Sequence, residues 1–106
     1  MDPRVKAALD IIESEINKPL LVNHLAARVG LCESRFEQLF KRETGHLVKA
    51  HIREIRLTKA KSMLSEPSLR IKEVASAVGY KYAPNFTRDF RKCHGKTPSQ
   101  YRNSVA

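Results

Sequence analysis

The chain has 106 residues, 42% of them hydrophobic, enough for one compact unit or two very small ones that share an element, so a large enzyme is excluded. It carries 20 Lys and Arg against 11 Asp and Glu, a net charge of +9. No run approaches the roughly 20 consecutive apolar residues of a membrane span, and the first residues lead into an amphipathic pattern instead of a signal-peptide core. We therefore expect a soluble, cytoplasmic protein with no membrane partner.

The first part of the chain predicts three helices. Asp2-Pro3 provides an N-cap acceptor and a proline at the first helical position, and apolar residues follow at helical spacing as far as Ile16. Asn17-Lys18-Pro19 ends this helix. A short helix over about residues 20–29, a turn at Gly30 and a helix over about residues 33–44 complete this part.

The second part predicts four more helices. Apolar spacing from residue 47 to residue 65 indicates one helix of about 19 residues, roughly 28 Å long at 1.5 Å per residue. After a break at Pro67, a short helix over about 71–78, a turn at Gly79 and a helix over about 84–94 follow. Thr97-Pro98-Ser99-Gln100 is a capping box that starts a last short helix. Strand signals are lacking, so the expected class is all-α.

One pattern occurs twice along the chain. A small residue and, four positions later, a glycine mark the crossing and the turn of a helix pair, and two aromatic residues and a second glycine follow. The first positions recur at an offset of 49 and the later ones at 50, because the second turn has one extra residue. The two copies are Ala26, Gly30, Phe36, Phe40 and Gly45, then Ala75, Gly79, Phe86, Phe90 and Gly95. This repeat indicates two helix-turn-helix units, each presenting a helix suited to the DNA major groove.

With these residues, the chain resembles the DNA-binding domain of AraC/XylS-family transcription regulators over essentially its whole length. Near the C-terminus the resemblance rests on Gly79-Tyr80, Asn85-Phe86, Arg88, Phe90-Arg91-Lys92, Gly95, Thr97-Pro98 and Tyr101-Arg102, and in the long helix on Ile55-Arg56-Leu57, Ala60-Lys61 and Leu64.

The resemblance implies an all-α fold of seven helices, in which a long central helix joins two helix-turn-helix units. One AraC-type domain would then cover residues 1–106, with the first subdomain over 1–46, the linking helix over 47–65 and the second subdomain over 66–106.

The function implied is that of a sequence-specific transcription regulator that inserts two recognition helices into successive major-groove segments of promoter DNA. Since the two helices differ in sequence, a monomer would prefer an asymmetric site of about 20 base pairs, with two half-sites one turn apart. Residues 1–46 hold seven basic and seven acidic side chains, whereas residues 47–106 hold thirteen and four. Phosphate affinity is therefore expected mainly in the second part.

The outward faces of the two recognition helices supply the candidate site residues. By resemblance, Ser34, Glu37 and Gln38 face bases in the first helix, where Gln38 suits adenine and Glu37 suits cytosine. Glu37 has an equally weighted alternative as a plain helix-surface acid. In the second helix the base-facing set is Ala83, Asn85, Thr87 and Arg88, with Arg88 suited to guanine or, alternatively, to phosphate. Phosphate contacts are expected from Arg35, Lys41, Arg91, Lys92, Lys96 and Thr97.

Other function classes are less well supported. The two cysteines and four histidines form no CxxC, HExxH or phosphate-loop pattern, so we expect no enzyme, metal or cofactor, and Cys32 and Cys93 to stay reduced. A helical protein-interaction module that has lost DNA binding is the alternative. RNA polymerase is a further candidate partner. Both a complete small regulator and the C-terminal part of a longer one, dimeric through a regulatory domain outside this sequence, are compatible with these residues.

Overall fold

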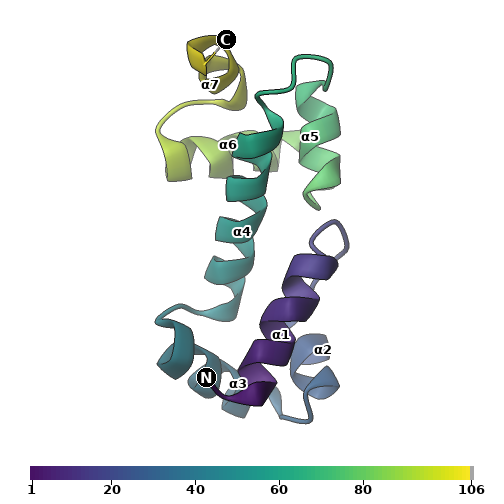
Figure 1. The fold of residues 1–106 in the computed structure, drawn as a ribbon, viewed down its shortest axis with the longest axis vertical. Coiled ribbons are helices and arrows are strands. Elements are labelled where there is room, and N and C mark those ends of the chain that lie inside the picture. The colour runs from purple at the N-terminus through teal and green to yellow at the C-terminus, as the bar shows by residue number, and fades with distance from the viewer. Residues whose placement is uncertain (106) are drawn as a thin grey trace. The chain divides into compact units, whose positions relative to one another are not determined.

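A computed structural model describes residues 1–105, and over that range the chain forms seven α-helices and no strand (Figure 1). The predicted all-α class with seven helices is confirmed. Among the described residues, no helix combines the length and the apolar character needed to cross a membrane. The helices are α1 (Pro3–Ser14), α2 (Val22–Arg28), α3 (Glu33–Thr44), α4 (Val48–Met63), α5 (Ile71–Ala77), α6 (Ala83–His94) and α7 (Pro98–Val105).

The chain divides into two compact units, Met1–Arg53 and the part from Glu54 onward. The division falls inside α4, so this helix contributes its first residues to one unit and its later residues to the other. Each unit therefore consists of an opening helix, a helix-turn-helix pair and a closing helix.

The first unit is built around aromatic side chains of α3. Phe36 and Phe40 lie one helical turn apart, are fully buried and pack with ring centroids 5.7 Å apart. Helices α1 and α2 both contact α3. The other three helices contribute further buried residues, namely Val5, Ala8 and Ile12 of α1, Val22, Leu25 and Ala26 of α2, and Val48 and Ile52 of α4.

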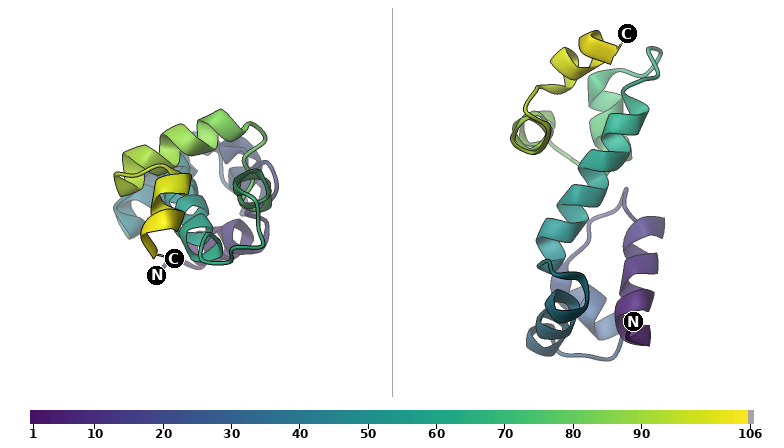
Figure 2. Two further views of the ribbon diagram at one scale, coloured as in Figure 1. Left: turned by 90° about the horizontal axis from the view of Figure 1, so that it is seen from above. Right: turned by 60° about the vertical axis from the view of Figure 1, so that its left-hand side comes forward.

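The second unit repeats this plan. Phe86 and Phe90 of α6 are fully buried, with ring centroids 5.7 Å apart. Helix α7 contacts α6, and the two lie next to each other in both views of Figure 2. The opening helix repeats the three-and-four spacing of α1, since Leu57, Ala60 and Leu64 stand where α1 has Val5, Ala8 and Ile12. Val74, Ala75 and Val78 complete the same core cluster.

Several helices are shorter than predicted. Helix α4 has 16 residues where about 19 were expected, which makes it about 24 Å long instead of 28 Å. Helix α1 ends at Ser14, although Ile16 beyond it is still buried. Helix α2 begins only at Val22 because Leu21, the N-cap residue, has an extended backbone. After α1 and α4 the apolar spacing continues past the helix end, since Ile16 and Leu64 lie in the adjoining turns and are buried in the core.

Four of the predicted end signals are confirmed, whereas α1 ends at Ser14, before the predicted stop at Asn17-Lys18-Pro19. The Asp2 side chain accepts a hydrogen bond from the Arg4 N–H at 2.8 Å and caps α1. Helix α7 starts with the full capping box, in which the Thr97 N–H donates to Gln100 Oε1 at 3.0 Å and the Gln100 N–H donates to Thr97 Oγ1 at 3.2 Å. Gly45 and Gly95 end α3 and α6 in the left-handed conformation, with φ of 81° and 77°.

Candidate nucleic-acid interface

Both helix-turn-helix turns are closed by the same hydrogen bond. In the first, Leu31 N–H donates to the Ala26 carbonyl at 2.9 Å, and in the second Tyr80 N–H donates to the Ala75 carbonyl at 2.9 Å. The two alanines are buried, which lets the second helix of each pair cross close to the first. Gly30 and Gly79, which lie within the two turns, have positive φ. These turns aim α3 and α6, each with one buried aromatic face and one exposed polar face.

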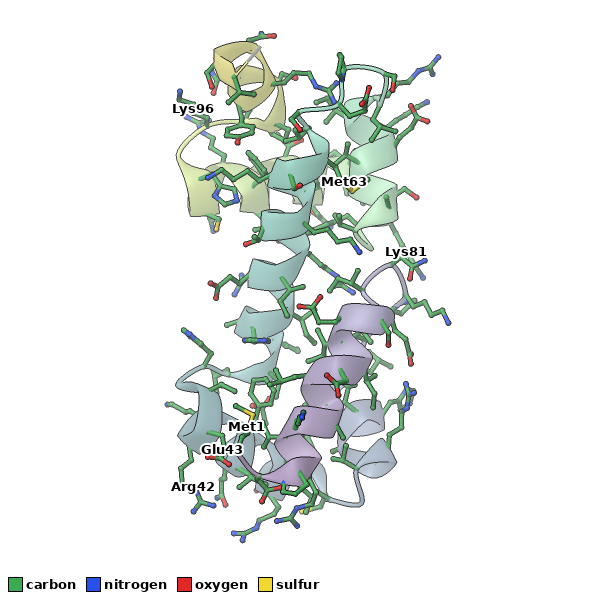
Figure 3. All side chains as sticks on the ribbon, in the orientation of Figure 1. Met1, Arg42, Glu43, Met63, Lys81 and Lys96 are labelled. Carbon is green, nitrogen blue, oxygen red and sulfur yellow. The ribbon has the colours of Figure 1, made fainter. Side chains whose placement is uncertain are left out.

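Helix α3 exposes most of its predicted site residues. Ser34, Arg35, Gln38 and Lys41 are all exposed, opposite the buried face formed by its two phenylalanines. Further along the helix, Arg42 and Glu43 also carry exposed or half-exposed side chains (Figure 3). Glu43 binds the chain's N-terminal end, since its Oε1 accepts the Asp2 N–H at 2.5 Å.

Glu37 differs from the other predicted residues of α3 because its carboxylate is engaged within the protein. The side chain is half-buried, and its Oε2 accepts a hydrogen bond from the Val48 N–H, 3.3 Å away, at the start of α4. An acid at a helix N-terminus satisfies a backbone donor and interacts favourably with the helix dipole. Sequence reasoning missed this contact. The repeat carried a signal for it, because the residue that corresponds to Val48 in the second unit is Pro98, which has no N–H to satisfy.

Helix α6 presents a basic, concave surface. Ala83, Asn85, Arg88, Arg91 and Lys92 are exposed, and Thr87 is half-buried. A groove of about 800 Å³ is lined by Ala83, Pro84, Thr87, Arg88, Arg91, Lys92 and Thr97. Six of these seven residues were predicted from the sequence as DNA contacts. Asn85 is exposed but outside the lining.

The C-terminal edge of this basic groove lies where α6 passes into α7. Lys96 is exposed on the connection between the two helices (Figure 3). Thr97 is half-buried, and its hydroxyl oxygen accepts a hydrogen bond within the capping box of α7. Its hydroxyl hydrogen can therefore be donated to a phosphate oxygen. Cations beside a helix N-terminus form a surface that favours anions.

A polar cluster lies behind Arg88. Asp89 Oδ2 accepts a hydrogen bond from the Tyr80 hydroxyl at 2.9 Å, and Asp89 Oδ1 lies 3.4 Å from Arg88 Nε. Arg56 of α4 lies half-buried near the same tyrosine, and its burial lowers the pKa of its guanidinium. Sequence reasoning did not single out Asp89 or its partner tyrosine for a role in the site.

The side chains that commonly bind metal ions are not gathered at one place in the described residues. Over residues 1–105, no group of three or more His, Cys, Asp or Glu side chains is arranged to hold a metal ion. Cys32 and Cys93 are free and exposed thiols. Cys32 precedes α3 as its N-cap and makes no side-chain capping bond.

Comparison with known proteins identifies the fold and the kind of domain. A helix-turn-helix domain model matches residues 25–104. The Msm operon regulatory protein of Streptococcus mutans is 30% identical over 95 residues, which is 90% of this chain and 34% of that protein. The xylose operon regulatory protein of Escherichia coli is 33% identical over 102 residues, 96% of this chain and 26% of that protein. The chain thus spans about a third or less of these relatives.

Solved structures share the fold of this chain. The C-terminal domain of AraT, a response regulator from Geobacillus stearothermophilus, superimposes with a TM-score of 0.93 at 28% identity, covering 97% of this chain and 86% of that one. The DNA-binding domain of AdpA, a global transcriptional factor, was solved in complex with a target DNA. It superimposes with a TM-score of 0.89 at 24% identity, covering 98% of this chain and 93% of that one.

Proposed function

The chain belongs to the AraC/XylS family of helix-turn-helix DNA-binding transcription regulators, and from that premise we propose that α3 and α6 are two unlike recognition helices. They enter successive major-groove segments of promoter DNA. The family consists of sequence-specific regulators, not of enzymes. The proposal gives each helix-turn-helix unit its own half of one asymmetric site.

The observation that carries the proposal is the basic groove on α6. Three cations, Arg88, Arg91 and Lys92, line a concave surface on the helix that the second helix-turn-helix projects. A duplex offers phosphates on both sides of its major groove, so a helix with cations along an exposed face can neutralise them as it enters. Thr87 lies on the same lining and suits the methyl group of thymine.

The site residues then take two kinds of role. Ser34 and Gln38 of α3 face bases, as do Ala83, Asn85, Thr87 and Arg88 of α6. Arg35, Lys41, Arg91, Lys92, Lys96 and Thr97 contact phosphate. For Glu37, the hydrogen bond to Val48 supports a role as the cap of α4 over contact with cytosine.

The remaining expectations are part of the same proposal. Residues 1–46 and 66–106 act as the two reading subdomains and residues 47–65 as the linking helix. The chain binds DNA in the cytoplasm as a monomer, and a dimer formed through a regulatory domain of a longer protein is the alternative. Binding at a promoter would place the chain beside RNA polymerase, and contact with the polymerase would follow. The two relatives are operon regulatory proteins, which supports binding at a promoter by analogy.

Selection from a random duplex library tests the proposal. The purified chain is incubated with the library at moderate salt, and the bound pool is sequenced. We expect an asymmetric motif of two unlike halves centred about 10 base pairs apart, one turn of B-DNA. Enrichment of a single half would mean that only one helix reads bases. A pool without enrichment would favour the protein-interaction module over the DNA reader.

A further inference from the structure

Position 89 is a place where α3 and α6 differ in character on the side that faces the core. In α3 the corresponding residue is Leu39, a core leucine that is 3% exposed. In α6 it is Asp89, whose side chain is only 16% exposed. A carboxylate this far from water is costly unless other groups hydrogen-bond to it or carry the opposite charge. The protein therefore needs specific partners for Asp89.

Those partners come from the turn and from the reading face. The Tyr80 hydroxyl donates to Asp89 Oδ2 at 2.9 Å, and Arg88 Nε lies 3.4 Å from Asp89 Oδ1. Tyr80 is itself fixed, because its backbone N–H donates to the Ala75 carbonyl and its ring packs on Phe86 with centroids 5.4 Å apart. The turn of the helix-turn-helix thus holds the carboxylate in place, and the carboxylate touches the arginine.

The pairing with Arg88 has little value for stability. Arg88 is 61% exposed, and exposed ion pairs contribute little. Its geometry matters more than its energy. Asp89 contacts Nε, the guanidinium nitrogen nearest the backbone, so the N–H groups at the far end of the guanidinium are not used by this contact. Guanine offers two acceptors side by side in the major groove, O6 and N7, and a planar pair of N–H donors matches them.

We propose that Asp89, held by Tyr80, is a positioning residue that orients the Arg88 guanidinium for bidentate contact with a guanine. The inference rests on the proposed function, in which Arg88 reads a base. An exposed arginine loses side-chain freedom when it binds, and a neighbour that restricts it beforehand reduces that loss. Asp89 therefore acts on base discrimination at one position of the site and leaves phosphate binding alone.

The test uses this chain and the duplex enriched from the random library, with each of the four bases in turn at the position that Arg88 controls. Asp89→Asn is nearly the same size and keeps an acceptor for the Tyr80 hydroxyl, but it removes the charge that attracts Arg88. We expect the preference for guanine to fall about two- to twelvefold, the range that freezing one side chain implies. Tyr80→Phe, which keeps the ring packing, should lower the preference in the same direction.

Two comparisons separate positioning from general damage. Asp10→Asn removes one negative charge from the exposed face of α1 and should leave the guanine preference unchanged. In an Arg88→Ala background, Asp89→Asn should have no further effect on base preference, because the two changes act through one contact. Thermal unfolding of each variant checks that the fold is intact.

Each result bears on a different claim. If Arg88→Ala reduces the preference for guanine and Asp89→Asn does not, the positioning role is wrong while the proposed function stands. A stronger preference for guanine in Asp89→Asn would also overturn it, since Asp89 would then be holding Arg88 back. If Arg88→Ala changes no base preference at all, the reading role of Arg88 fails, and the inference fails with it.

Discussion

Glu37 and Val48 join α3 to the start of α4, through a 3.3 Å hydrogen bond from the Val48 N–H to the Glu37 carboxylate. The bond satisfies one of the N-terminal donors that every helix leaves open. It also holds an acidic side chain at the positive end of the α4 dipole. The second unit has Thr87 and Pro98 at the two corresponding positions and needs no such bond.

Loss of this cap should destabilise the first unit. Glu37→Ala is expected to lower the free energy of unfolding by about 1 kcal/mol, the usual cost of removing a helix cap. Glu37→Gln should cost less, because its amide oxygen can still accept from Val48. Urea denaturation of the three proteins measures both values. A base preference altered at one position by Glu37→Ala, with stability unchanged, would show that Glu37 reads DNA instead.

Phosphate contacts from the α6 groove should appear in the salt dependence of binding. Lys92→Ala removes one lining cation and should reduce the slope of log K against log salt by about 0.9, the value for one lost phosphate contact. The loss in affinity should be equal for enriched and random duplexes. Fluorescence anisotropy titrations at several salt concentrations measure this. Lys6→Ala, an exposed change on α1, is the control, and an equal loss of slope there would contradict the assignment.

The glycine that ends α6 should tolerate substitution poorly. Gly95 has φ of 77°, while an added Cβ would meet no atom within 4 Å. The cost of Gly95→Ala is therefore one of backbone conformation and not of crowding, and is expected to be about 1–2 kcal/mol. Gly95→Asn should cost less, since asparagine adopts the left-handed region more readily. Equal losses for the two variants in thermal unfolding would argue against this explanation.

An exposed ion pair gives the first unit a small acid sensitivity. Arg28 donates two hydrogen bonds to the Glu15 carboxylate, at 2.9 and 2.8 Å, and they lower the pKa of Glu15 below its ordinary value. A lowered carboxyl pKa stabilises the folded state at neutral pH, and this contribution disappears as the pH falls through the folded-state pKa. Arg28→Ala should return the pKa of Glu15 toward 4.5. An NMR titration of the Glu15 side chain measures it, and an unchanged value would show that the pair does not persist in solution.

The fold was largely predictable because its signals are local and occur twice. Gly45, Gly95 and the Thr97 capping box mark helix ends through their own backbone and side-chain chemistry, and the structure agrees with each. Helix ends such as that of α1 were overestimated because Ile16, in the turn beyond the helix, is buried in the core as a helical residue would be.

The two polar contacts of the site were not predictable in the same way. Helical periodicity places Glu37 beside outward-facing residues, but it carries no information on the backbone N–H that lies 11 positions later in the chain. The hydrogen bond of Asp89 was not predictable either, since its partner, the Tyr80 hydroxyl, belongs to the turn that precedes α6. Only the alignment of the two repeats, with Leu39 against Asp89 and Val48 against Pro98, gives the sequence a signal for either.

The central claim is that two unlike helices each read their own half of one DNA site. Library selection with two single variants tests it most directly, one changing Gln38 to alanine on α3 and the other changing Arg88 to alanine on α6. We predict that Gln38→Ala erases base preference at one position in one half of the wild-type motif, and that Arg88→Ala does so in the other half. Loss of preference in the same half for both variants, or in neither, would contradict the claim.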